Sequence, residues 1–230
     1  MAKIKKISRK YDEYFLCDSR PNFVLFNCKI EFQIMHTKAP LPLTLLNGKE
    51  TLPIIEAYFE FNHLKHLYRQ GWLRHGIEQK YCESVAEHSF CVALLALFLA
   101  DEYHIELDKA KVIRMALIHD LGEIYAGDFT PQDIIERSQK YQLEKQSIFQ
   151  VLSKLPNGSE WIALWEEYEK GESAESQFVH QVDRLELALQ ASVYEHLELA
   201  NLSVFFESAN QALSAEQLKF ITRALENLRK

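Results

Sequence analysis

The run His119-Asp120-Leu121-Gly122-Glu123 places one imidazole and two carboxylates within five residues. Adjacent side chains cannot share a helix face, but at a helix C-terminus the backbone can turn the histidine and the aspartate toward one point. The glutamate, four residues after the histidine, then lies on the same side. His88 and Asp183 can join them from two other segments. Mixed nitrogen and oxygen ligation suits Mn, Fe, Co or Zn better than Ca, so we expect one divalent metal here.

Capped helices are expected to position these side chains. Ser84-Val85-Ala86-Glu87 has the form of a capping box, which predicts a helix from Ser84 to about Tyr103 with His88 one turn inside it. Asp108 can cap the next helix, which should run to about Leu121. Asp183 lies in the pattern Phe178-Val179-x-x-Val182-x-x-Leu185, whose apolar spacing is helical. Three helices would therefore supply the metal ligands.

Other segments also carry helix signals. Apolar residues at helical spacing predict a helix over residues 52–68, with Gly71 as its stop. Thr130-Pro131 predicts a further helix start, with proline in the first helical position. N-caps of later helices are expected at Ser159, Ser173 and Ser214, the last with Gln217 completing a capping box.

Composition agrees with a mainly helical protein. The 230 residues include only 7 Gly and 6 Pro, too few turn formers for many short strands. A formal net charge of -7 argues against a general nucleic-acid-binding surface. The apolar run Phe90–Ala100 is too short to span a membrane and indicates a buried core helix, with Cys91 buried in it. Four cysteines without a C-x-x-C pair favour free thiols in the cytoplasm.

The first 34 residues differ from the rest, with seven basic and four acidic side chains. Residues 27–34 alternate polar and apolar side chains, which predicts one half-buried β-strand. Four interpretations stay open for this N-terminal extension: an edge strand on the helical body, a poorly ordered tail, a start of translation placed too early with Met35 as the true start, or a targeting peptide. Residues 35–230 form the expected catalytic domain.

The order His, His-Asp, Asp resembles that of the HD-domain metal-dependent phosphohydrolases. Glu83-Ser84-Val85-Ala86-Glu87-His88-Ser89, together with His119-Asp120-x-x-Glu123 and Gly127-Asp128, is similar to their 5'-deoxynucleotidase branch. Later segments, from Leu164-Trp165-Glu166-Glu167-Tyr168-Glu169 to Tyr194-Glu195, look like the HD-domain-containing protein 2 group. The resemblance covers about residues 52–200 and implies an all-α HD-domain helical bundle with a metal site between its helices.

The resemblance also implies roles for individual residues. A divalent cation, often cobalt or manganese in such enzymes, would be bound by His88, His119, Asp120 and Asp183. Glu123 and Asp128 would be needed for activity, and with the backbone of Phe129 they could hold a second cation, for example Mg. Trp72 would pack on the deoxyribose. Either Arg69 or Arg74 would hold the phosphate, and the sequence does not decide between them.

These roles fit phosphate ester chemistry. A bound cation neutralises the phosphate dianion and lowers the pKa of its water. Glu123 could position or deprotonate the attacking water, or ligate the second cation, while an acid near Asp128 could protonate the departing 5' oxygen. A guanidinium from Arg74 or Arg69 would pair with phosphate oxygens in a fork. We therefore expect a phosphomonoesterase that converts deoxynucleoside 5'-monophosphates to deoxynucleosides and phosphate.

Two alternatives remain at this point. One is another HD hydrolase, acting on nucleoside triphosphates or guanosine tetraphosphate. The other is a non-catalytic, metal-stabilised helical binding protein, against which the extra acids Glu123 and Asp128 argue. The expected partner is a small-molecule nucleotide, without nucleic acid or membrane. The resemblance also suggests a homodimer, with the helices after Ser159 as contacts.

Overall fold

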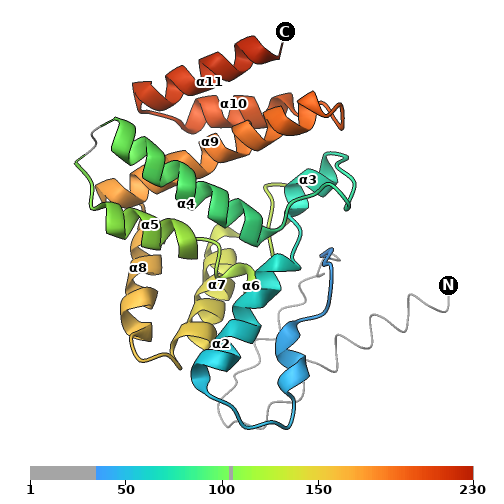
Figure 1. The fold of residues 1–230 in the computed structure, drawn as a ribbon, viewed down its shortest axis with the longest axis vertical. Helices are drawn as coiled ribbons and strands as arrows, with labels where there is room; N and C mark the ends of the chain where they lie inside the picture. The colour runs from blue at the N-terminus through green and yellow to red at the C-terminus, as the bar shows by residue number, and fades with distance from the viewer. Residues whose placement is uncertain (1–34, 104–105, 230) are drawn as a thin grey trace, which may run out of the picture. The chain divides into compact units, whose positions relative to one another are not determined.

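Figure 1 shows a computed structural model that describes residues 35–103 and 106–229. Within those residues the regular structure is helical, apart from two isolated β-bridges that pair Thr37 with Leu67 and Tyr68 with Ser84. The expected all-α fold is confirmed. The predicted strand at residues 27–34 and the alternatives for residues 1–34 lie outside the described residues. In chain order the elements are η1 (Pro42–Leu46), α2 (Pro53–Phe61), η2 (Asn62–Lys65), α3 (Gln70–Arg74), α4 (Val85–Glu102), α5 (Lys109–Ile118), α6 (Glu123–Ala126), α7 (Arg137–Leu152), α8 (Gly158–Lys170), α9 (Ala174–His196), α10 (Ser203–Ala212) and α11 (Glu216–Leu228).

Helix α9 is the element around which the bundle is organised. It packs against α4, α5, α8, α10 and α11 (Figure 1). Val179, Val182 and Leu185 belong to the larger apolar core, which also contains buried residues of α4 and α5. Further along the same helix, Ala188 and Tyr194 belong to a smaller core with Trp72 and Phe206. Asp183 thus lies on the helix that joins both cores.

Three predicted N-caps are confirmed. The Ser84 side chain accepts a hydrogen bond from the backbone N–H of Glu87, whose carboxylate accepts from the Ser84 backbone N–H, so the capping box is complete. Asp108 caps α5, and Ser173 caps α9. Each cap satisfies backbone donors that would otherwise lack a partner. The starts of the three helices that lead to the predicted ligands are therefore fixed by local sequence.

Thr130-Pro131 does not begin a helix, contrary to the prediction. The backbone N–H of Thr130 donates to Oδ2 of Asp133 at 2.6 Å, which stabilises a turn, and α7 begins later, at Arg137. Hydrogen bonds from the backbone to a side-chain oxygen can cap a helix or close a turn, and here the one accepted by Asp133 closes a turn.

Three other predicted helix boundaries differ from those in the structure. Gly71 lies inside α3 instead of stopping a helix. Helix α8 begins at Gly158 after Asn157, so Ser159 is not its cap. Ser214 does not cap α11 either: its backbone N–H and hydroxyl donate to the Gln181 side chain, and the helix begins two residues later.

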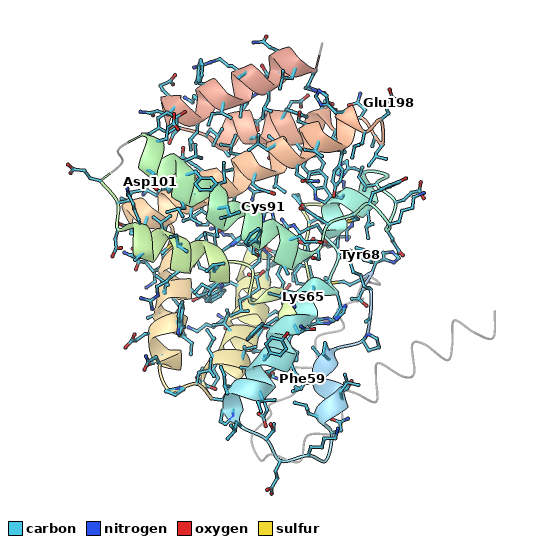
Figure 2. All side chains as sticks on the ribbon, viewed as in Figure 1. Phe59, Lys65, Tyr68, Cys91, Asp101 and Glu198 are labelled. Atoms are coloured by element: carbon cyan, nitrogen blue, oxygen red, sulfur yellow. The ribbon has the colours of Figure 1, made fainter. Side chains whose placement is uncertain are left out.

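The apolar run Phe90–Ala100 forms part of α4 but is only partly buried. Val92, Ala96 and Ala100 have no exposed surface, whereas Phe90, Leu94 and Phe98 are exposed on another face. Cys91, labelled on α4 in Figure 2, is exposed too, so its predicted burial is wrong. None of the helices in the described ranges is long and apolar enough to cross a membrane.

Candidate metal centre

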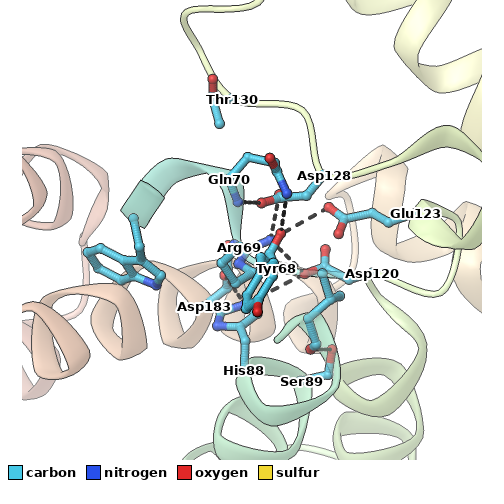
Figure 3. Close-up of polar contacts among 12 residues, drawn as sticks. Tyr68, Arg69, Gln70, His88, Ser89, Asp120, Glu123, Asp128, Thr130 and Asp183 are labelled. Carbon is cyan, nitrogen blue, oxygen red and sulfur yellow. Dashed lines mark hydrogen bonds and ion pairs between the residues drawn. The ribbon is translucent and has the colours of Figure 1, made fainter. Parts of the chain in front are cut away.

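Three helices bring the predicted ligands together (Figure 3). His88 lies in α4, Asp183 lies in α9, and His119 and Asp120 follow the last turn of α5. Nitrogen and oxygen atoms of His88, His119 and Asp120 lie within 4.8 Å of one another. Oδ1 of Asp183 lies 3.1 Å from Nε2 of His88. The four predicted ligands therefore converge, as the HD order suggested.

Each of the two imidazoles is held through its Nδ1 atom, and its Nε2 atom faces a carboxylate of the cluster. Nδ1 of His119 donates to the carbonyl oxygen of Ala116 at 2.7 Å, and Nδ1 of His88 lies 2.7 Å from Oε2 of Glu186. The Nε2 atoms of both rings are buried and have no hydrogen-bond partner. Buried polar atoms without partners are rare and call for an explanation. Two unpartnered imidazole nitrogens beside the carboxylates of Asp120 and Asp183 fit a divalent transition metal.

Large aromatic side chains hold the His119 segment in place. The indole N–H of Trp165 donates to the His119 carbonyl oxygen at 3.3 Å, and its ring stacks on Tyr141. Tyr168 packs edge-on against the His119 ring, with centroids 5.5 Å apart. The last turn of α5 is therefore fixed by α8, which carries both Trp165 and Tyr168.

Arg69 lies among three carboxylates. Its Nη1 atom is 2.8 Å from Oδ1 of Asp128, 3.3 Å from Oδ2 of Asp120 and 3.6 Å from Oε1 of Glu123. Asp128 also accepts the backbone N–H of Gln70 at 2.5 Å. Both predicted catalytic acids thus adjoin the ligand cluster, and one guanidinium links them to it (Figure 3).

Burial and neighbouring charges shift the pKa values of Glu123 and Asp120 in opposite directions. Burial, and then the charges of Asp120 and Asp128, raise the pKa of Glu123 well above its usual value. Burial alone would also raise the pKa of Asp120, but the positive charges of His119 and Arg69 outweigh it and hold that pKa well below the usual range. A carboxyl group with a raised pKa next to an ionised one is a common arrangement for proton transfer.

The other predicted substrate residues lie outside this cluster. Arg74 pairs with Asp133 at 2.5 Å and donates to the Thr130 hydroxyl. Trp72 is 1% exposed, and its indole N–H donates to Oε1 of Glu83 at 2.7 Å. Of the two candidate arginines, Arg69 is the one in contact with the predicted metal ligands and catalytic acids.

Glu186 is a site residue that the sequence analysis missed. It lies three residues after Asp183 on α9, so the two carboxylates project from the same face of the helix. That spacing was visible in the sequence. What the spacing does not reveal is that His88, almost one hundred residues earlier, lies opposite that face.

The fold and the cluster together define an all-α protein with a candidate metal centre between its helices. Comparison with known proteins makes the assignment specific: the chain belongs to the HD domain family, whose model matches residues 61–225. The resemblance drawn from the sequence is confirmed.

Relatives cover most of the chain. The 5'-deoxynucleotidase HDDC2 of Dictyostelium discoideum is 39% identical over 189 residues, which cover 75% of this chain and 98% of that protein. The human 5'-deoxynucleotidase HDDC2 is 35% identical over 167 residues, which cover 71% of this chain and 79% of that protein.

Solved structures share the fold over most of the chain. A conserved hypothetical protein from Pyrococcus furiosus is 31% identical with a TM-score of 0.62, over 75% of this chain and 99% of that one. A predicted metal-dependent phosphohydrolase from Magnetospirillum magnetotacticum is 26% identical with a TM-score of 0.59, over 77% of this chain and 91% of that one.

Proposed function

We propose that this protein is a metal-dependent 5'-deoxynucleotidase that hydrolyses deoxynucleoside 5'-monophosphates to deoxynucleosides and phosphate. The observation that carries the proposal is the pair of buried, unpartnered Nε2 atoms of His88 and His119, which adjoin Asp120. The HDDC2 relatives, named for this activity, support the choice of substrate.

The ligands His88, His119, Asp120 and Asp183 would hold the cation. When bound, a divalent cation offsets the charge of the phosphate dianion and lowers the pKa of a coordinated water. We propose cobalt, manganese or another transition metal for this position. A second cation, such as Mg, would be held by Glu123, Asp128 and the backbone of Phe129.

Two acidic side chains of the protein then carry out the proton transfers, one as acceptor and one as donor. Oε2 of Glu123, which is buried and has no hydrogen-bond partner, takes a proton from the water that attacks phosphorus. As the new P–O bond forms, the bond to the 5' oxygen breaks. An acid near Asp128 supplies the proton to the departing oxygen, since both oxygens of Asp128 itself accept hydrogen bonds, from Arg69 and from the Gln70 backbone. The proton balance closes because one acid gains a proton and the other loses one.

Arg69 is the proposed phosphate-binding arginine. Its guanidinium already lies beside Asp120, Glu123 and Asp128, so the phosphate would be drawn to the same point as the attacking water. Trp72 would shape the deoxyribose side of the pocket through the α3 segment that it anchors. The cytoplasmic location drawn from the cysteine pattern stays a prediction.

We also propose a homodimer. After Ser159, where the contacts were expected, Val193 is exposed on α9 and Leu197 directly after it; before Ser159, Phe90, Leu94 and Phe98 form an exposed apolar row on α4. Contiguous exposed apolar side chains favour an interaction surface. Sedimentation of Phe98→Glu should show a monomer at concentrations where the wild type is a dimer. Ile134→Glu, at an exposed position away from both helices, is the control and should sediment like the wild type.

Phosphate release from a panel of deoxy- and ribonucleoside monophosphates tests the function. The protein is stripped of metal and assayed with Mn, Co, Mg or Zn restored. Release confined to deoxy substrates, dependent on metal and lost in Asp120→Ala, is the expected result. Asp133→Ala is the matched control, because this acid pairs with Arg74 outside the cluster.

Two other results would redirect the assignment. Release from nucleoside triphosphates or guanosine tetraphosphate alone would indicate another HD hydrolase. Bound metal without turnover of any of these substrates would indicate a non-catalytic binding protein.

A further inference from the structure

A buried glutamate from α9 faces the metal ligand His88 from the side opposite the cluster. Oε2 of Glu186 lies 2.7 Å from Nδ1 of His88, a length typical of a charge-assisted hydrogen bond. The His88 ring has no exposed surface and Glu186 is 4% exposed, so water does not compete for this contact. The pair therefore fixes the ring more firmly than a surface contact of the same length would.

The contact selects one tautomer of His88. A carboxylate can only accept at this position, so Nδ1 carries a proton, and Nε2 is the nitrogen that would bind the cation through its lone pair. Nε2 is the atom that lies 3.1 Å from Asp183 and 3.7 Å from Oδ2 of Asp120. Nε2 thus faces the other predicted ligands.

A second carboxyl group lies close by but has a different partner. Oxygen atoms of Glu83 and Glu186 and a nitrogen of His88 lie within 4.8 Å of one another. Glu83 accepts the indole N–H of Trp72 at 2.7 Å. Burial, and then the charge of Glu186, raise the pKa of Glu83 to about 7. The hydrogen bond to His88 is therefore made by Glu186, while Glu83 is engaged with α3.

We propose that Glu186 is a positioning residue for the metal centre: by accepting the Nδ1–H of His88, it holds Nε2 toward the cation. The proposal rests on the metal dependence of the proposed function, but it concerns metal affinity and not the identity of the substrate. Carboxylates that orient a ligating histidine in this way typically contribute about 10–100-fold to metal affinity or activity.

The test measures metal binding directly. Metal-free Glu186→Leu and Glu186→Gln are titrated with Co²⁺ and Mn²⁺ in competition with a chromophoric chelator, and the visible absorption of bound Co²⁺ is recorded. Glutamine keeps an acceptor oxygen and nearly the same shape, whereas leucine keeps only the volume. Glu195→Leu is the matched control, since Glu195 lies on the same helix and binds Arg229 and the Leu202 backbone instead.

Glu186→Leu should bind Co²⁺ about 10–100-fold more weakly than the wild type and show an altered Co²⁺ spectrum. Glu186→Gln should recover most of the affinity and the wild-type spectrum, and Glu195→Leu should match the wild type. Wild-type affinity in a folded Glu186→Leu would overturn the proposal. Equal losses in the two Glu186 variants would overturn it as well, since the acceptor oxygen would then not matter. Circular dichroism establishes folding, and if the leucine variant does not fold, a Glu186→Gln variant with ten-fold weaker binding overturns the proposal.

Discussion

Replacing Arg69 with glutamine should destabilise the metal-free protein more than the metal-bound one. The guanidinium is the cation within 4 Å of three acids, Asp120, Glu123 and Asp128, and only 13% of its side chain is exposed. Removing one partner of a buried ion pair costs about 3–5 kcal/mol, because the remaining charge stays buried without compensation. For a chain of this size that corresponds to a fall in Tm of about 6–20 °C.

Divalent metal should reduce the difference in stability between Arg69→Gln and the wild type. A cation held among the same carboxylates takes over the role of the missing guanidinium, and at 100 times its Kd a ligand adds about 2.7 kcal/mol of stability. Calorimetry of wild type and Arg69→Gln, each with and without Mn²⁺, measures both effects. A metal-free Arg69→Gln protein that melts within about 2 °C of the wild type would refute the reasoning, since that shift corresponds to less than about 1 kcal/mol.

Arg74→Gln is the matched control for this experiment. Arg74 pairs with Asp133 and Thr130, and both lie outside the ligand cluster. Its loss should lower Tm by the same amount with and without Mn²⁺. A deficit that shrinks with metal in both variants would mean that metal stabilises the whole bundle and not the carboxylates around Arg69.

Three further substitutions test the packing, the capping and the titration of single sites. In Gly122→Ala the new Cβ would lie 2.8 Å from Cβ of Glu144, so thermal unfolding should show a loss of about 1–3 kcal/mol, and an unchanged Tm would contradict the packing. Ser84→Ala removes the α4 cap and should cost about 1 kcal/mol in denaturant unfolding, whereas no loss would mean that the cap is dispensable. Burial lowers the pKa of His63 to about 4. As pH falls from 6.5 toward 4, the unfolded state therefore binds a proton at this histidine while the folded state does not. Wild-type stability should therefore fall by about 3 kcal/mol more than that of His63→Gln over this range, and parallel pH profiles would refute the assigned burial.

The metal ligands could be predicted from the sequence because their signals are local. His119 and Asp120 are adjacent, and His88 directly follows a complete capping box, so each has a recognisable context in one short segment. The helix that bears Asp183 has regular apolar spacing. Chain order and local pattern were enough to predict that these residues lie close together, while their role as metal ligands stays a prediction.

Contacts between residues far apart in the sequence could not be predicted from chain order and local pattern. Arg69 and Arg74 both lie near Trp72 in sequence, and only tertiary packing places the first beside Asp120 and the second beside Asp133. The partner of His88 Nδ1 comes from α9, and no periodicity within α4 could identify it. Such contacts depend on how the helices are packed, which local sequence does not encode.

The errors have physical causes too. A threonine before a proline is compatible with a helix start or with a turn, and the hydrogen bonds from Thr130 to Asp133 stabilise the turn. The Phe90–Ala100 run has no polar side chain to mark an outer face, so nothing in it reveals that Cys91 and Phe98 are exposed.

Charge balance at the site argues for more than one cation during turnover. Asp120, Glu123 and Asp128 lie around the guanidinium of Arg69, and Asp183 lies 3.8 Å from that of Arg184. With all four carboxylates ionised, one divalent cation and these two guanidinium groups would only balance their charge, which leaves no net positive charge for a phosphate dianion. A second cation beside Glu123 and Asp128 would make the site net positive and phosphate binding favourable. Equilibrium dialysis with Mn²⁺ should therefore find about one ion per chain without phosphate and about two with it. One ion per chain under both conditions would mean that protonation of Glu123, and not a second cation, offsets the charge.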